Sequence, residues 1–168
     1  MRMKKRAVRL VNDYADLILR LSYTYLGSTA DAEDVCQEVL LKLLGRAEGF
    51  ESPEHERAWV VRVTANRCKD LLRRRAARPT VALDEAPEPA APEVVDVSGR
   101  AALVLRAVMR LPLDYREAIF LCYYEDYPVR DIARACGCSE DAAAARLSRG
   151  RAKLKVLLKE AGYDEEDL

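Results

Sequence analysis

Apolar residues recur along most of the chain at the three- and four-residue spacing that lets one face of a helix reach a core. In the first half this spacing covers about residues 5–26, 28–45 and 52–75. We expect the last stretch to divide into a short and a longer helix, which makes four. Three or four more helices follow between residues 101 and 159. No stretch alternates apolar and polar residues between hairpin turns, so the pattern predicts an all-α protein.

Residues that end or begin helices stand at the borders of these stretches. Gly27 and Gly137 suit the left-handed conformation that closes many helices. Three serines are of the type that caps a helix N-terminus: Ser28, Ser52 and Ser139. The borders therefore agree with the helices that the apolar spacing predicts.

Residues 79–97 differ from the rest of the chain. This stretch contains four prolines and five acidic residues, which is too much proline for a helix and too little bulky apolar surface for a core. We predict a flexible acidic, proline-rich linker that joins two small helical domains, residues 1–78 and 98–168. The linker is either a plain spacer or a segment whose acids contact a basic surface or imitate a nucleic-acid strand.

Charge is balanced overall and strongly segregated along the chain. The 28 basic and 28 acidic residues give a net charge of zero. Residues 57–78, however, hold eight cations and one acid, and residues 146–159 hold six cations and no acid. Phosphate attraction depends on such local patches, because salt screens charges over about 8 Å. Two basic surfaces that face nucleic acid are therefore compatible with a neutral chain; for the second run, a plain solvated helix face is the alternative.

The stretch from Pro128 to Leu158 predicts a helix-turn-helix with its turn at Gly137. A short, glycine-containing turn between two helices is the geometry that places a second helix in the major groove of DNA. That second helix carries the cations of residues 146–159. The C-terminal domain is therefore expected to bind DNA.

Acidic and amide side chains gather near the start of the second predicted helix. Their spacing of about one turn forms a stripe that suits a basic surface on a partner helix. A solvated acidic face beside a helix N-terminus is the alternative. The members of this stripe are Asp31, Glu33, Asp34, Gln37 and Glu38.

Three segments, in order, resemble the extracytoplasmic-function (ECF) sigma factors of bacterial RNA polymerase. Residues 31–44 (DAEDVCQEVLLKLL) are similar to the family's polymerase-clamp-binding helix, and residues 56–75 (ERAWVVRVTANRCKDLLRRR) to its promoter-melting and minus-ten-reading helix. Residues 111–154 are similar to its minus-thirty-five-reading domain. The resemblance implies that the acidic stripe binds core RNA polymerase, and that the chain directs promoter recognition, DNA melting and transcription initiation. It also implies an anti-sigma factor as a partner.

On the minus-ten helix the resemblance assigns a mixture of side chains that suits a single DNA strand. Cations follow the phosphates, whereas amides and carboxylates read base edges. The family is thought to capture an unstacked base. Stacking of that base on Trp59 is the alternative to a place for Trp59 and Val63 in the core. The expected contacts are Arg62, Asn66, Arg67, Lys69, Asp70, Arg73 and Arg74.

In the helix-turn-helix the resemblance implies minus-thirty-five contacts, among which arginines bonded to guanine discriminate by about 1–3 kcal/mol. The start of the recognition helix departs from the family, because residues 142–145 are all alanine and donate no side-chain hydrogen bond. Backbone contacts or DNA shape are therefore expected to matter more here than base reading. The expected contacts are Ser139, Arg146, Ser148, Arg149, Arg151 and Lys153.

Other chemistry finds little support in the sequence. There is no glycine-rich phosphate loop, nucleophile elbow or metal-binding histidine pair, so we expect no enzyme activity, no cofactor and no metal site. The five cysteines form no disulfide framework. Cys136 and Cys138 are expected to be small buried residues, with metal binding or redox sensing as the alternative.

No apolar stretch approaches the length of a membrane span, so we expect a cytoplasmic protein without membrane insertion. The competing function is a sigma-like adaptor or a stand-alone helix-turn-helix regulator that binds DNA and does not start transcription. Polymerase association through residues 31–38 separates the two functions.

Overall fold

Helices make up all the regular secondary structure of the described residues, 1–78 and 99–163 of a computed structural model. The all-α prediction is therefore confirmed. The helices group into two compact units. The predicted linker, 79–97, lies outside the described residues. The first unit holds α1 (Arg2–Leu26), α2 (Thr29–Gly45) and α3 (Pro53–Ala77). The second holds α4 (Arg100–Met109), α5 (Leu113–Tyr123), α6 (Val129–Cys136) and α7 (Glu140–Glu160).

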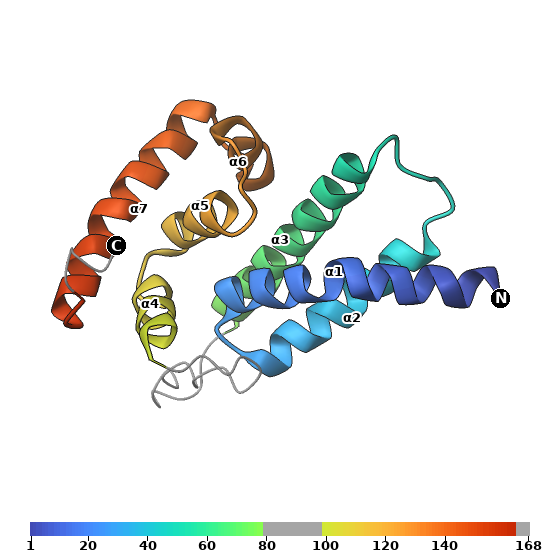
Figure 1. The fold of residues 1–168 in the computed structure, drawn as a ribbon, viewed down its shortest axis with the longest axis horizontal. Coiled ribbons are helices and arrows are strands. Elements are labelled where there is room, and N and C mark those ends of the chain that lie inside the picture. The colour runs from blue at the N-terminus through green and yellow to red at the C-terminus, as the bar shows by residue number, and fades with distance from the viewer. Residues whose placement is uncertain (79–98, 164–168) are drawn as a thin grey trace. The chain divides into compact units, whose positions relative to one another are not determined.

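In the first unit, α1 and α2 lie side by side in opposite directions, and α3 packs against both (Figure 1). Gly27 closes α1 in the left-handed conformation, with φ of 64°. The Ser28 and Ser52 hydroxyls accept hydrogen bonds from backbone N–H groups in the first turns of α2 and α3, as predicted for N-caps. The three helices share an apolar core whose fully buried members include Ile18, Leu21, Val39, Leu43, Val60 and Cys68.

The far end of α2 is tied to α1 by an arginine. The Arg6 guanidinium donates hydrogen bonds from Nη2 to the carbonyl oxygens of Leu43 and Arg46, at 3.3 Å and 3.2 Å. These carbonyls lie at the C-terminal end of the helix, where backbone oxygens lack partners within the helix. Arg6 therefore caps α2 from a neighbouring element, and its positive charge suits the negative end of the helix dipole.

Two predictions for the first unit are wrong. α3 is one continuous helix, so the described part of this unit has three helices where we expected four. No proline or glycine occurs between residues 54 and 77, so nothing interrupts the backbone hydrogen bonds. Trp59 and Val63 are only half-buried, because the core-facing side of α3 is formed by Val60, Val61, Thr64, Ala65 and Cys68.

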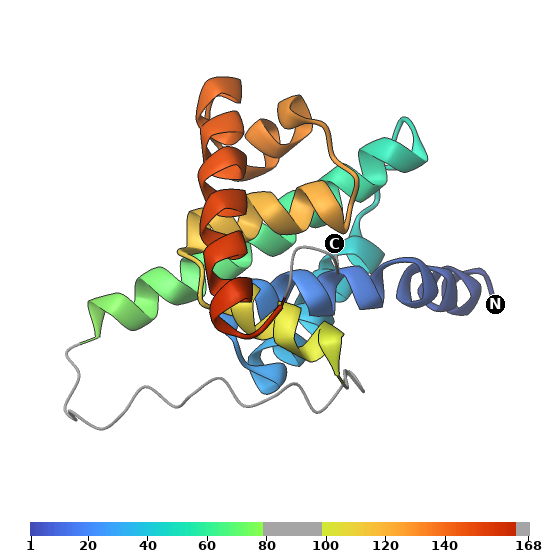
Figure 2. The ribbon, with the colours of Figure 1, turned by 60° about the vertical axis from the view of Figure 1, so that its left-hand side comes forward.

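The second unit is built around α7, which α4, α5 and α6 all contact (Figures 1 and 2). α6 and α7 form the predicted helix-turn-helix, with Gly137 left-handed at φ 67° and the Ser139 hydroxyl accepting from the Ala142 N–H at 3.1 Å. α5 crosses α7 at Gly150, which is buried. A Cβ at this position would lie 3.2 Å from Ile119 Cγ1 and 3.3 Å from Tyr115 Cβ. The missing side chain therefore permits the close approach of the two helices.

We expect Gly150→Val to destabilise the second unit by about 1–3 kcal/mol, because the added carbons have to displace α5 or adopt a strained rotamer. Amide hydrogen exchange in α5 and α7 measures this loss for the unit itself. Ala152→Val, at an exposed position of the same helix, is the matched control and should cost no more than about 0.7 kcal/mol of helix propensity. Equal protection in the two variants would contradict the close packing at Gly150.

Candidate polymerase and DNA interfaces

The acidic stripe of α2 divides into two groups. Glu33, Asp34 and Gln37 are exposed. Asp31 and Glu38 are half-buried and form ion pairs with α3, Asp31 with Arg75 at 2.8 Å and Glu38 with Arg67 at 2.8 Å. Three residues of the predicted stripe are thus accessible to a partner, and the other two form ion pairs within the unit.

Glu38 lies between two cations. Its Oε2 accepts a hydrogen bond from Arg67 Nε, and its Oε1 lies 3.6 Å from Lys42 Nζ. The Arg67 hydrogen bond is the main cause that lowers the pKa of Glu38 below its ordinary value. Glu38 is therefore held as a carboxylate.

The predicted minus-ten residues form two stripes on α3 rather than one. At 100° per residue, the residues at positions 62, 66, 69 and 73 share one line along the helix, and those at 67, 70 and 74 share another. Asn66 and Arg62 are exposed on the first line. On the second line, Asp70 accepts a hydrogen bond from Arg67 Nη1 at 3.2 Å and forms an ion pair with Arg74, whose Nη2 lies 3.2 Å from Oδ2. The second line is therefore an ion-pair chain, with Arg67 joining Asp70 to Glu38.

An aromatic cluster lies beside the start of α3, and the sequence reasoning missed it. The Phe50 ring contacts the rings of Trp59 and His55, with centroids 5.7 Å and 5.4 Å apart. The Arg46 guanidinium lies 4.7 Å from the Phe50 centroid and 5.5 Å from that of Trp59. Trp59 thus packs against the loop before α3 instead of the core. The available signal was the presence of aromatic and cationic residues on both sides of Ser52: Arg46 and Phe50 precede it, and His55 follows it.

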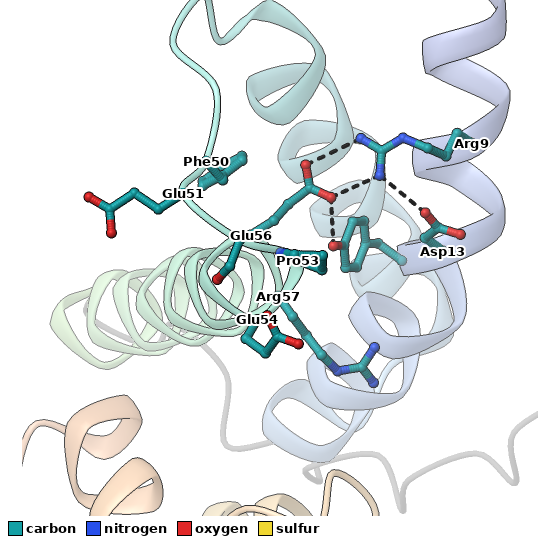
Figure 3. A pocket seen from close by; sticks show the side chains of 10 residues that line it. Arg9, Asp13, Phe50, Glu51, Pro53, Glu54, Glu56 and Arg57 are labelled. Carbon is teal, nitrogen blue, oxygen red and sulfur yellow. Dashed lines mark hydrogen bonds and ion pairs between the residues drawn. The ribbon is translucent and has the colours of Figure 1, made fainter.

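On another side of the same loop, α1 is tied to the first turn of α3 (Figure 3). Arg9 donates to both oxygens of Glu56, at 2.9 Å and 3.2 Å, and the Tyr14 hydroxyl donates to Glu56 at 2.7 Å. Asp13 also accepts from Arg9, at 3.2 Å. These groups line an open pocket of about 720 Å³. Since the pairs join residues of α1 and α3, they fix the position where the loop enters α3.

The pKa values of Glu56 and Tyr14 are shifted in opposite directions. The Arg9 hydrogen bonds, and then the one from Tyr14, lower the pKa of Glu56 below 4.5. Burial, and then the neighbouring Glu56 carboxylate, raises the pKa of Tyr14. At neutral pH the site therefore holds an ionised Glu56 and a protonated Tyr14.

The cations of α7 differ in how they are held. Arg149 is exposed. Arg146 is half-buried, with Nη2 3.6 Å from the Asp114 carboxylate of α5. Arg151 donates from Nε to the Tyr123 hydroxyl at 2.7 Å, and its guanidinium lies 5.4 Å from the Tyr123 ring centroid. α5 therefore positions two of the predicted minus-thirty-five arginines, a support that could not be predicted from the sequence.

The remaining predicted residues of the recognition helix vary in burial. Ser148 and Lys153 are exposed, and Ser139 serves as the N-cap of α7. Among the four alanines, Ala143 is fully buried, whereas Ala144 is exposed. The front of α7 thus presents methyl groups rather than hydrogen-bond donors.

The cysteines do not form a site in the described part of the chain. Cys36, Cys68 and Cys136 are buried, while Cys122 and Cys138 are half-buried. Burial raises the pKa of the Cys36 and Cys68 thiols to about 11, which keeps them protonated at neutral pH. Among the described residues, no group of three or more histidine, cysteine or carboxylate side chains is arranged to hold a metal ion. Nor does any described helix combine the length and apolar character needed to cross a membrane.

Known proteins resemble this chain over both units. Family models of sigma-70 region 2 and sigma-70 region 4 match residues 10–78 and 101–154. The ECF RNA polymerase sigma factor SigM of Mycobacterium tuberculosis is 34% identical over 139 residues, covering 83% of this chain and 70% of SigM. The ECF sigma factor SigE of Mycolicibacterium smegmatis is 30% identical over 155 residues, covering 89% of this chain and 60% of SigE.

Two solved structures share the fold. The sigma factor RpoE of Bartonella quintana, solved with the anti-sigma factor NepR, aligns with a TM-score of 0.71 at 24% identity over 92% of this chain and 98% of that one. CnrH, solved with the cytosolic domain of CnrY, aligns with a TM-score of 0.62 at 21% identity over 94% of this chain and 90% of that one.

The helical fold and the matched regions define a bacterial transcription initiation factor. The chain belongs to the ECF sigma factor family. It binds RNA polymerase and directs promoter-specific initiation, and it is not an enzyme.

We expect Glu56→Gln to destabilise the first unit at pH 7 by about 1 kcal/mol, because a charged hydrogen-bond acceptor is lost and the half-exposed Arg9 limits its worth. The folded pKa of Glu56 is lowered, so its stabilisation is complete above pH 4.5 and is lost as the pH falls below that value. The difference in the free energy of unfolding between wild type and Glu56→Gln should therefore disappear as the pH is lowered. Urea unfolding followed by the fluorescence of Trp59, the single tryptophan, measures this.

Glu54→Gln is the matched control for this prediction. Glu54 is exposed in the same helical turn, and its removal takes the same charge from the start of α3. Glu54→Gln should lower the free energy of unfolding only by the lost interaction of a carboxylate with the helix dipole, about 0.3–1 kcal/mol at low salt. Equal effects of the two variants at every pH would show that the contacts of Glu56 with Arg9 and Tyr14 contribute no stability of their own.

Proposed function

We propose that residues 1–78 bind core RNA polymerase through α2 and the minus-ten element through α3, while residues 98–168 bind the minus-thirty-five element through α7. The observation that carries this assignment is the separation of charge within the first unit. Exposed Glu33, Asp34 and Gln37 lie on α2, and exposed Arg62 and Asn66 lie on α3. An acidic surface on one helix and a cationic surface on the next suit two partners of opposite charge.

For the minus-ten element, the line of Arg62, Asn66, Lys69 and Arg73 is the proposed strand-binding surface. Its cations would follow the phosphates of the non-template strand, and the Asn66 amide would contact a base edge. The cluster of Phe50, Trp59 and Arg46 offers flat faces near one end of that line. Since stacking tolerates any base, such faces support the capture of an unpaired base, with Asn66 supplying discrimination.

For the minus-thirty-five element, the exposed Arg149 and Ser148 and the α5-supported Arg151 are the proposed contacts. Arg146 is half-buried against Asp114, so we assign it a smaller share. The alanine front of α7 provides methyl groups for thymine and no donors for guanine. Phosphate contacts and DNA shape are therefore proposed to dominate binding by this unit.

We further propose that the protein works in the cytoplasm, where core polymerase and promoters are found. An anti-sigma factor is proposed to hold it inactive. The sigma factor RpoE, which shares this fold, was solved with the anti-sigma factor NepR, and CnrH, which also shares it, was solved with the cytosolic domain of CnrY.

We expect Asp34→Lys to abolish co-elution of the protein with core polymerase at low salt, because it reverses an exposed charge in the centre of the α2 stripe. Size-exclusion chromatography of the mixture, with run-off transcription from a promoter library, measures both binding and initiation. Glu51→Lys makes the same reversal in the exposed loop before α3 and should leave co-elution unchanged. If Asp34→Lys still co-elutes, α2 is not the polymerase-binding surface.

We expect Asn66→Ala to reduce the open promoter complex roughly tenfold while leaving polymerase binding intact, because one base contact worth about 1–3 kcal/mol is lost. Permanganate reactivity of unpaired thymines measures the fraction of open complex. Asn12→Ala, at an exposed position of α1, is the matched control and should melt the promoter like wild type. Unchanged melting in Asn66→Ala would remove Asn66 from the minus-ten site.

A further inference from the structure

Two carboxylates of the proposed polymerase-binding stripe already have partners on the proposed DNA-binding helix. Glu38 Oε2 lies 2.8 Å from Arg67 Nε, and Asp31 Oδ2 lies 2.8 Å from Arg75 Nη2. Both pairs join α2 to α3, and both lie inside the first unit. In the free protein, the proposed polymerase-binding and DNA-binding surfaces are therefore joined by ion pairs.

Only some of the carboxylates in the α2 stripe form ion pairs with α3. In the described part of the chain, Glu33 and Asp34 form no ion pair, although they lie on the same helix between Asp31 and Glu38. Arg67 is the most enclosed of these cations, with 22% of its side chain exposed. Its Nε and Nη1 are taken by Glu38 and Asp70. In this arrangement a phosphate would have to compete with two carboxylates for Arg67.

We propose that Glu38 and Asp31 each serve two partners in turn: in the free protein they hold Arg67 and Arg75 away from DNA, and in the complex they pair with basic side chains of the polymerase and release both arginines to phosphates. This inference rests on the proposed function of α2 and α3. It makes polymerase binding a condition for full strand binding by the same unit.

The exchange is physically inexpensive. Each carboxylate exchanges one arginine for a cation of the polymerase, and each arginine exchanges that carboxylate for a phosphate. Lys42 keeps Glu38 as a partner and Asp70 keeps Arg74, so no charge is left unpaired. Ion pairs at partly exposed sites contribute little net stability, which lets a competing partner displace them. By linkage, DNA binding then strengthens polymerase binding by the same factor. In the free protein, the Arg67 hydrogen bond lowers the pKa of Glu38 and keeps its carboxylate charged.

Strand binding by the free protein tests the proposal without polymerase. The probe is a fluorescent single-stranded oligonucleotide, titrated at several salt concentrations. Glu38→Gln should tighten binding about two- to fivefold, as expected for the loss of one partly exposed ion pair. The slope of log affinity against log salt should steepen by about 0.7, the value for one additional phosphate contact on a single strand.

Three comparisons make the result specific. Glu33→Gln removes the same charge from the same helix and should not tighten binding. In an Arg67→Gln background, Glu38→Gln should give no gain, because the released cation is missing. Asp31→Asn, tested with and without Arg75→Gln, repeats the experiment on the second pair and serves if the Glu38 variants fold poorly.

The outcomes separate the proposal from the function on which it rests. Equal gains in Glu38→Gln and Glu33→Gln would mean general charge repulsion and would overturn the exchange. No gain in either the Glu38 or the Asp31 variant would mean that the released arginines do not contact the strand, and would overturn it as well. Asn66→Ala reports on the strand site independently of both ion pairs. If it weakens strand binding while no gain is seen, only the exchange fails; if it too has no effect, the minus-ten assignment fails.

Discussion

The apolar contacts of α1 with α2 and α3 determine which residues of the first unit face outward. Ile18 and Leu21 of α1 are fully buried, as are Val39 of α2 and Val60 of α3. Because a helix turns 100° per residue, burying these positions sets the direction of every other side chain on the same helix. The outward line through Asn66 and the exposed carboxylates of α2 are thus consequences of the core. A shift of α3 by one residue that put this line in the places of Val61 and Ala65 would move Val60 and Thr64 out of the core.

Opposite charges on neighbouring helices give this unit both its cohesion and its chemistry. Arg67 joins Glu38 to Asp70, and Arg9 joins Glu56 to Asp13. Each arginine uses its planar fork to hold two carboxylates at once, which a lysine could not do with the same geometry. The zero net charge of the chain therefore hides a set of internal pairings, and the free attraction for phosphate is smaller than the count of cations suggests.

The sequence predicted the elements well because their signals are local. Ser28, Ser52 and Ser139 cap helices, and Gly137 makes the turn between α6 and α7. The sequence could not predict which candidate side chains are engaged by other helices. Arg67 and Glu38 are 29 residues apart, Arg151 and Tyr123 are 28 apart, and Arg9 and Glu56 are 47 apart. Such pairs depend on how helices pack. Periodicity assigned Trp59 to the core because it records apolar character, not the position of the loop that contacts the ring.

Gly150 also determines the orientation of the two residues beside it. With this position pressed against Ile119 and Tyr115 of α5, α7 cannot turn about its own axis. Arg149 and Arg151 then project about 200° apart around the helix. A groove that received α7 would meet one guanidinium on each of its walls, and neither arginine could take the place of the other. In the proposed complex, a residue with no side chain would thereby direct the two cations toward opposite strands of the duplex.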